Sequence, residues 1–274
     1  MDESRTGSVA DQATSVSPAR RRTGSGRPGS AIGVIGELLL TAGVITLLFV
    51  VWQLWLGDLI YGAQRNAVGQ ELSHTWAQEY VPPRVPVSPS PTPTPTPTTT
   101  EPSTAEPVVL PQPADAQVFG ILHIPRFGSD YAVPMAGGIS RERTLDPIGV
   151  GHYPGTSMPG EVGNFAVAAH RTTWGKPFNR LADLHVGDAI VIETPGGWYT
   201  YRFRTLEYVH PDAGEVLLPV PQAVTAPAGM RFMTMTSCSP MYAMSERIVG
   251  FAVFDSFTPR ASGAPLSLTT EAAA

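Results

Sequence analysis

The sequence contains a single cysteine, Cys238, in 274 residues. A lone cysteine cannot form an intramolecular disulfide, so any chemical role for Cys238 is that of a thiol. Charge is also sparse, with 18 Lys and Arg against 23 Asp and Glu and a formal net charge of -5. No strong basic patch lies beyond the first thirty residues. This composition argues against nucleic acid as a partner.

Only one long apolar run is present. It extends from Ala31 to Leu56 and carries one charge, Glu37. At about 1.5 Å per residue, such a helix is long enough to cross a hydrocarbon core of about 30 Å. A cleaved signal peptide is the alternative, but the run is too long and no small-residue cleavage site follows it. We therefore expect residues 31–57 to be a transmembrane anchor.

The flanking residues predict how this anchor is oriented. An arginine cluster at positions 20–27 precedes the apolar run, and Trp52 and Trp55 stand at its far end. Positive charge favours the cytoplasmic side, and tryptophan favours the membrane interface. We expect residues 1–30 to be a disordered cytoplasmic tail and the rest of the chain to be extracellular, held at the cell membrane by a single span.

Proline is concentrated in one segment. Residues 58–80 lack proline and are a possible helical stalk, whereas residues 81–116 contain the run PSPTPTPTPTTTEPSTAEP. Such a run cannot bury a core and favours extended polyproline II, so it predicts a linker. Residues 258–274 are again of low complexity and are expected to be disordered.

Residues 117–257 have a different texture, with short apolar runs separated by Gly and Pro. This pattern predicts an all-β domain, either a sandwich or a small closed barrel. Short helices are expected at Ser140–Leu145 and Lys176–Leu184, and a break in the long strand near Thr205. The predicted strands are Val118–Ile124, Tyr131–Met135, Asn164–His170, Asp188–Glu193, Trp198–Tyr208, Arg231–Ser237 and Arg247–Phe254.

Cys238 lies at the end of a predicted strand and is followed by Ser239-Pro240, which ends the ladder. A side chain there is held in place yet accessible to a substrate. A thiol with an ordinary pKa of about 8.5 is mostly protonated at neutral pH and needs a base or a positive neighbour to act as a nucleophile. The alternative is a buried cysteine that serves only packing.

Two histidines and one arginine are the candidate partners of this thiol. His170 ends an apolar strand, and His152 is the second choice, in the loop sequence GHYPG. Arg247 opens the last predicted strand, where a guanidinium could donate hydrogen bonds to an oxyanion. Two histidines and one cysteine without ligand spacing do not indicate zinc, so we expect no metal.

At these residues the sequence resembles the sortases, Gram-positive transpeptidases with the signature TLxTC. Here the signature reads TMTSC and ends at Cys238, with Arg247 following and His170 upstream in NFAVAAHRT. The N-terminal anchor, the GHYPGT and MPGEVGNFA stretches and the short spacing from Cys to Arg are most similar to class E, the housekeeping-type enzymes of actinobacteria. The sequence departs from the family pattern at Met235, Ser237 and Ala169.

The resemblance implies a closed eight-stranded barrel and a two-step acyl transfer catalysed by Cys238, His170 and Arg247. Thr236, Ser237 and His152 are expected to contact the substrate, and no cofactor is expected. The implied partners are secreted proteins with a C-terminal LAXTG-like or LPXTG-like sorting signal and an amine of a peptidoglycan precursor of the lipid II type. The segment 207–229 would shape substrate specificity.

Other functions remain open on the residues alone. An L,D-transpeptidase would show a Ser-x-Gly-Cys context, and cysteine peptidases usually place Cys before His; neither pattern is present here. A pilus-building sortase would carry an Asp-Pro-aromatic lid before residue 117, which is also absent. A membrane-tethered binding or scaffold domain with an inert cysteine is the alternative outside enzymology.

Overall fold

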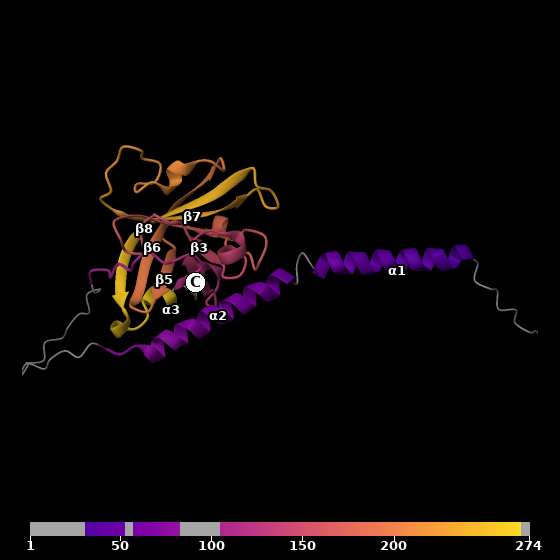
Figure 1. The fold of residues 1–274 in the computed structure, drawn as a ribbon, viewed down its shortest axis with the longest axis horizontal. Coiled ribbons are helices and arrows are strands. Elements are labelled where there is room, and N and C mark those ends of the chain that lie inside the picture. Colours follow the sequence, from indigo (N-terminus) through magenta and orange to yellow (C-terminus); the bar gives the residue numbers. More distant parts are fainter. Residues whose placement is uncertain (1–30, 53–56, 83–104, 270–274) are drawn as a thin grey trace, which may run out of the picture. The chain divides into compact units, whose positions relative to one another are not determined.

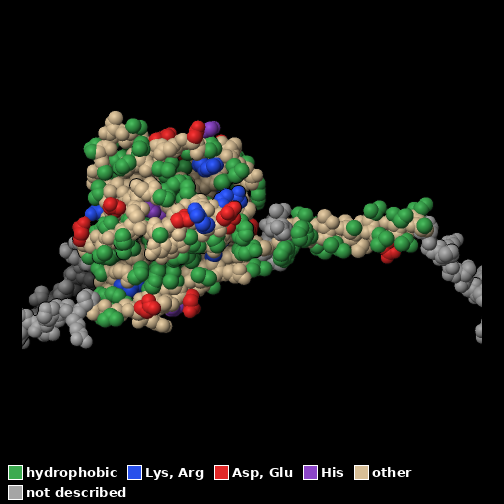
Figure 2. All heavy atoms as spheres, in the orientation of Figure 1, with side chains coloured by type: hydrophobic (Ala, Val, Ile, Leu, Met, Phe, Trp, Pro, Cys, Tyr) green, Lys and Arg blue, Asp and Glu red, His purple; other side chains and the backbone are tan. Residues whose placement is uncertain are grey.

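The computed structural model describes residues 31–52, 57–82 and 105–269, and the chain divides into two units at residues 49 and 50. The first unit holds most of helix α1 (Ala31–Val51), and the second holds the other described elements. α1 is long and apolar enough to cross a membrane, and hydrophobic side chains line its exposed surface (Figure 2). The tail predicted for residues 1–30 lies outside the described residues.

The second unit is built on eight strands that close into a barrel in the order β1-β2-β3-β4-β7-β8-β6-β5. This confirms the predicted all-β, eight-stranded closed barrel. The pairs β2 with β3 and β4 with β7 are parallel, and the other pairs are antiparallel. The strands are β1 (Val118–His123), β2 (Val133–Gly137), β3 (Val150–His152), β4 (Gly163–Ala169), β5 (Ala189–Thr194), β6 (Gly197–Val209), β7 (Arg231–Ser239) and β8 (Glu246–Pro259).

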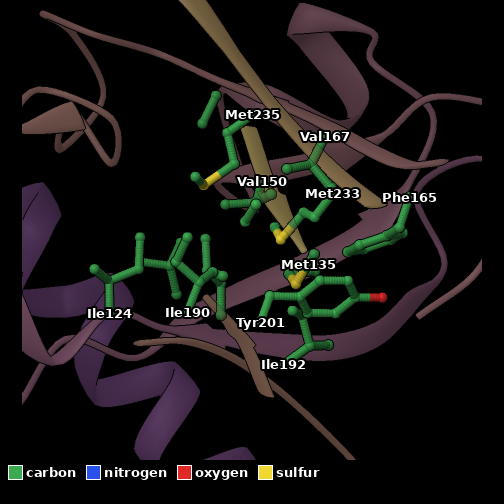
Figure 3. Close-up of a cluster of buried hydrophobic side chains, with 14 of the residues drawn as sticks. Ile124, Met135, Val150, Phe165, Val167, Ile190, Ile192, Tyr201, Met233 and Met235 are labelled. Carbon is green, nitrogen blue, oxygen red and sulfur yellow. The ribbon is translucent and has the colours of Figure 1, made fainter. Parts of the chain in front are cut away.

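The barrel interior is filled by one apolar cluster to which most strands contribute. Figure 3 shows part of it, with the sulfur atoms of three methionines meeting aromatic and branched side chains. Because side chains alternate between the two faces of a strand, every second residue of β7 points inward. Each such fully buried side chain contributes about 1.5–3 kcal/mol. Examples from five strands are Met135, Phe165, Ile192, Tyr201 and Met235, all with no exposed surface.

The predicted strands match the observed ones to within a few residues, except for β3, which was not predicted. β3 has only three residues, one of them Gly151, so it lacks a recognisable alternation. The expected break in the long strand is present, as a register shift between Phe203 and Thr205. The helix expected at Ser140–Leu145 is a single π-helical turn at Arg141–Leu145 (η3).

The helix predicted at Lys176–Leu184 is wrong in extent, because only Leu181–Asp183 (η4) forms a 3-10 turn. Lys176 has a φ of 42°, which prevents an α-helix from starting there. Further 3-10 turns lie at Pro125–Phe127 (η2) and Gly214–Leu217 (η5). η5 lies within segment 207–229, and its Val216 packs against Phe251 of β8.

Two segments predicted to stand apart from the barrel lie against it instead. Helix α2 (Gly57–Glu79) occupies the predicted stalk and runs along one side of the barrel (Figure 1). Of the predicted linker, residues 81–82 and 105–116 are described. The second stretch also packs on the barrel, where Pro107 is buried and Leu110 contacts the core cluster. The proline-rich composition predicted a linker here and did not reveal the apolar side chains that attach this segment to the barrel.

The C-terminal segment, described as far as residue 269, also contains regular structure. The predicted tail contains the end of β8, the 3-10 turn Arg260–Ser262 (η6) and the short helix α3 (Leu266–Thr269). Arg260 is 7% exposed and stacks over the ring of Trp198 at 4.5 Å. The low-complexity composition predicted a disordered tail and gave no indication that Arg260 is buried and attaches the segment to the barrel.

Arg260 belongs to a buried polar cluster that joins three parts of the chain. At its centre is Glu193 of β5, which is 1% exposed. It accepts hydrogen bonds from Ser73 of α2 at 2.8 Å and from Arg260 at 2.7 Å, and lies 2.9 Å from Nε2 of His123 in β1. Burial raises the pKa of Glu193, but the hydrogen bonds from His123, Arg260 and Ser73 lower it below its ordinary value of 4.5 overall.

This cluster predicts an acid-dependent loss of stability. A carboxyl whose pKa is lowered by folding stabilises the native state above its unfolded pKa, and that contribution is lost as pH falls through the folded value. We expect the unfolding midpoint of the wild-type chain to fall as pH drops below about 4.5. The fall should be shallower in Glu193→Gln, whereas the exposed control Glu215→Gln should follow the wild type. Identical pH profiles of the wild type and Glu193→Gln would contradict the assignment.

Candidate active site

Strand register brings the three predicted catalytic residues to one edge of the barrel. β4 and β7 are parallel, with Ala168 opposite Thr236, so two residues further along both strands come His170 and Cys238. On the other side of β7, Cys238 pairs directly with Arg247 of the antiparallel β8. Neighbouring strands lie about 4.8 Å apart. The backbone of Cys238 is therefore flanked by His170 on one side and by Arg247 on the other.

Cys238 itself is partly exposed and is a free thiol. It lies one residue before the end of β7, on the strand face opposite the interior Met235. The buried residues before it hold the strand in place, while its own position at the strand end is accessible. This is the combination that a nucleophile requires, and it differs from that of a packing cysteine enclosed in the core.

His170 is held by a partner that the sequence did not reveal. Its Nε2 lies 2.6 Å from Oδ1 of Asp146, and both side chains are mostly covered, at 12% and 19% exposed. Its carbonyl accepts a hydrogen bond from the backbone of Phe178 at 3.0 Å, which closes the loop after β4. Asp146 is 24 positions upstream and follows η3. Only folding brings this carboxylate to the imidazole.

Arg247 is half-buried at the start of β8. In this structure its guanidinium Nη1 donates to the carbonyls of Met244 and Glu246, at 3.1 Å and 2.9 Å. Met244 lies in the turn between β7 and β8, and Glu246 is the first residue of β8. The positively charged guanidinium is therefore held at the start of β8 by neutral backbone acceptors.

Comparison with known proteins agrees with this geometry. A family model described as "Sortase domain" matches residues 122–255. Sortase SrtE2 of Streptomyces coelicolor is 30% identical over 236 residues, which cover 82% of this chain and 84% of that protein. This chain belongs to the sortase family. It is thus a homologue within an enzyme family of cysteine transpeptidases.

Further relatives of this sortase are of the same class. Sortase SrtE1 of Streptomyces coelicolor is 33% identical over 261 residues, which are 92% of this chain and 66% of the relative. The crystal structure of sortase E1 from Streptomyces coelicolor with a tripeptide in the active site aligns with a TM-score of 0.53 at 36% identity. That alignment covers 57% of this chain and 99% of the other. The predicted resemblance to class E is confirmed.

Thr236 and Ser237, which precede the cysteine, join the sortase strands β4 and β7. Ser237 is 4% exposed, and its hydroxyl donates to the carbonyl of Ala169 at 2.7 Å. Thr236 is 5% exposed; its hydroxyl lies 2.9 Å from that of Tyr153 and 3.3 Å from the carbonyl of Val167. Both hydroxyls fasten the strand that carries His170, and their contact with a substrate stays a prediction.

The bond from Ser237 predicts a measurable effect on the sortase site. Ser237→Ala leaves the carbonyl of Ala169 without this donor, so we expect a loss of about 1 kcal/mol in unfolding free energy. A several-fold loss in the rate of peptide cleavage should accompany it, because Ala169 directly precedes His170. Ser237→Thr keeps the hydroxyl and is the matched control. Unchanged stability of Ser237→Ala in chemical denaturation would argue against this role.

His152, the other predicted substrate contact, is buried at 1% exposure. Its ring stacks on Phe165 at 5.3 Å, and its Nε2 lies 3.1 Å from the carbonyl of Ser157 and 3.0 Å from the hydroxyl of Thr156. Burial lowers the pKa of His152 and so favours the neutral ring. The hydrogen bond to Ser157 acts in the opposite direction but is the smaller effect. His152 is the last residue of β3 rather than the loop residue expected from the sequence, and these contacts join it to the loop that follows. Direct binding of substrate by His152 stays a prediction.

Arg171 is a further site residue that sequence reasoning did not select. It is 7% exposed, and its Nη1 lies 3.4 Å from the carbonyl of Cys238. Asn179 donates to the carbonyl of Arg171 at 3.0 Å. The guanidinium thus links the end of β4 to the end of β7. Its position directly after His170 was the only sequence signal.

Proposed function

We propose that this sortase is a membrane-anchored cysteine transpeptidase that cleaves a C-terminal sorting signal between Thr and Gly and joins the secreted protein to the cell wall. The observation that supports this most strongly is the register across β4, β7 and β8, which aligns His170, Cys238 and Arg247 at one barrel edge. A thiol, a proton-transfer group and a fixed cation are the three components that acyl transfer through a thioester needs.

The first step forms the thioacyl intermediate. The thiol of Cys238 gives its proton to His170 as its sulfur attacks the carbonyl carbon of the signal's Thr, and the carbonyl oxygen takes up the negative charge of the tetrahedral intermediate. As this collapses, the C–N bond to Gly breaks and His170 gives a proton to the departing amine. The second step reverses the roles. An amine of the peptidoglycan precursor attacks the thioester, His170 takes its proton, and the C–S bond breaks as His170 passes that proton to the sulfur, which restores the thiol.

Arg247 acts on the carbonyl that reacts. It donates hydrogen bonds either to the oxyanion of the tetrahedral intermediate or to the substrate backbone beside it. The two roles separate kinetically, because loss of a contact made only in the transition state lowers kcat and leaves KM unchanged, whereas loss of uniform binding raises KM. The neutral carbonyls that hold the guanidinium leave its positive charge available for either role.

The membrane arrangement follows from α1. We propose that α1 is a single span with the N-terminus in the cytoplasm and the barrel outside the cell. The apolar helix of 21 residues supports a span, and the arginines at positions 20–27 before it support the orientation. In this position the thiol meets secreted proteins and the amine of a lipid-linked precursor on the outer surface of the membrane.

The proposal is tested by incubating the full chain in detergent micelles with paired LAXTG and LPXTG peptides and a glycine-type amine. We expect cleavage between Thr and Gly, transfer to the amine, and a preference for the LAXTG peptide. Mass spectrometry of the protein should detect an adduct on Cys238 equal in mass to the N-terminal peptide fragment less water. No cleavage of either peptide, or cleavage without a Cys238 adduct, would overturn the proposal.

A further inference from the structure

We propose that helix α2 is part of the catalytic machinery, because Arg65 of α2 holds the turn that carries Asp146 and Asp146 in turn positions His170. Both are positioning residues, and neither touches the reacting atoms. This inference rests on the proposed function in that His170 is the proton-transfer group. It goes beyond it by assigning a role to a helix outside the barrel.

The contact between Asp146 and His170 determines which ring nitrogen serves the reaction. The carboxylate occupies Nε2 at 2.6 Å, so Nδ1 is the nitrogen left to exchange a proton with substrate. In a neutral imidazole the two nitrogens are not equivalent, and an acceptor on one of them fixes the tautomer and the ring orientation. Asp146 therefore holds the proton on Nε2 and leaves Nδ1 as the acceptor.

Asp146 is held in place by local backbone structure on one side. It ends the π-helical turn η3, its amide donates to the carbonyl of Arg141 at 2.8 Å, and Pro147 follows. Proline has no amide hydrogen, so no further helical hydrogen bond can form from that position. Single π-turns are frequently found at functional sites. The carbonyl of Asp146, however, is not satisfied within the turn.

Arg65 supplies the missing donor from α2. Its Nη2 donates to the carbonyl of Asp146, and the side chain is only 8% exposed. Nε and Nη1 have no hydrogen-bond partner among the described residues. A buried guanidinium with incomplete hydrogen bonding is costly. An apolar side chain at this position would attach α2 to the barrel at a lower free-energy cost. The arginine therefore indicates a role beyond packing.

Gly149, which has no side chain, leaves space for the side chain of Arg65. Gly149 has a φ of 129°, and a Cβ there would stand 3.1 Å from Cδ of Arg65. α2 is aligned by a further polar contact to the segment just before β2, in which the amide of Ala132 donates to Oδ1 of Asn66 at 3.3 Å. The position of Arg65, and through it of His170, thus depends on the docking of α2.

The test uses the full chain in detergent micelles and four variants. Asp146→Ala removes the carboxylate, Arg65→Met removes the donor, and Arg65→Lys retains a positive donor. The matched control is Gln70→Ala, which removes an exposed side-chain bond from α2 to the carbonyl of Asp130, in the turn before β2. The readouts are kcat and KM for peptide cleavage, the unfolding midpoint, and nitrogen-15 NMR of the histidine rings, with His170 assigned by its loss in His170→Ala.

We expect the neutral His170 ring of the wild type to carry its proton on Nε2. Asp146→Ala should give a mixture of tautomers and a fall in kcat of about 100-fold with little change in KM, the effect of misplacing a catalytic group by about 1 Å. Arg65→Met should change both readouts in the same direction, by about tenfold in kcat, and Arg65→Lys should recover part of the loss. Gln70→Ala should resemble the wild type.

Two results would overturn the inference. If Asp146→Ala keeps its proton on Nε2 and its kcat is unchanged, Asp146 does not position His170. If Arg65→Met is no different from Gln70→Ala, α2 has no role in positioning His170. If Arg65→Met does not fold, Arg65→Lys decides the second point through its NMR signature. A wild-type chain that cleaves no sorting peptide yet shows the tautomer dependence would reject the proposed function and leave the positioning intact.

Discussion

Replacement of Cys238 by alanine is expected to abolish peptide cleavage and transfer while the barrel stays folded. The thioester cannot form without the sulfur, and the small, partly exposed side chain at a strand end contributes little to the core. His170→Ala should lower kcat by about 100-fold to 10,000-fold, the usual range for loss of a proton-transfer group. Arg247→Ala should lower kcat/KM by about 100-fold to 1,000-fold, as for the loss of an oxyanion donor.

Matched controls separate these effects from general damage. His185→Ala removes an exposed histidine on a loop of another part of the barrel, and Arg180→Ala removes an exposed arginine paired with Asp183. Both should cleave peptide at the wild-type rate. Rates are measured by chromatography of the cleaved peptide, and folding by the unfolding midpoint. Retained turnover in Cys238→Ala, with a wild-type unfolding midpoint, would reject the thiol as nucleophile.

Gly69→Ala is expected to destabilise the protein by about 3 kcal/mol, at the upper end of the usual cost of overpacking. In a solvent-exposed helix the same change stabilises by about 1 kcal/mol, because alanine favours the helix more than glycine does. Here a Cβ on Gly69 would stand 2.0 Å from the carbonyl oxygen of Ala132, which is backbone and cannot rotate away. The sign of the effect therefore reports whether α2 lies on the barrel.

Gly62→Ala is the control on the same helix. Its added Cβ would lie 3.4 Å from the carbonyl oxygen of Gly175, an ordinary contact, so we expect equal or greater stability than in the wild type. Chemical denaturation of the full chain measures both. Gly69→Ala should also become sensitive to limited proteolysis within α2 and lose kcat, since Arg65 moves with the helix. A Gly69→Ala protein as stable as Gly62→Ala would show that α2 is not docked as described.

Several elements could be predicted because their signals are local. Alternating apolar residues located seven of the eight strands, and the apolar run located α1, since burial in a barrel or a membrane requires those patterns over consecutive residues. The positions of Cys238, His170 and Arg247 at strand ends followed from the same runs. β3 was missed because three residues are too few to show a period.

Segments that contact the barrel through one or two side chains were not predictable. The stretch 105–116 and the C-terminal turn were predicted to be linker and tail because proline and alanine are frequent in both. Their attachment rests on single residues such as Leu110 and Arg260, which have no repeating pattern. A composition average over a segment does not detect one buried anchor.

The sequence by itself determined the all-β class, the apolar helix, the thiol and its two strand-end partners, and the family resemblance, because each is written in neighbouring residues. Only the tertiary structure decided that α2 packs on the barrel and that Arg65, Asp146 and His170 form one line of contacts across 105 residues of chain. Such contacts depend on strand order and on where a turn ends. They form only when segments distant in the sequence come together in the folded chain, so no local pattern of residues predicts them.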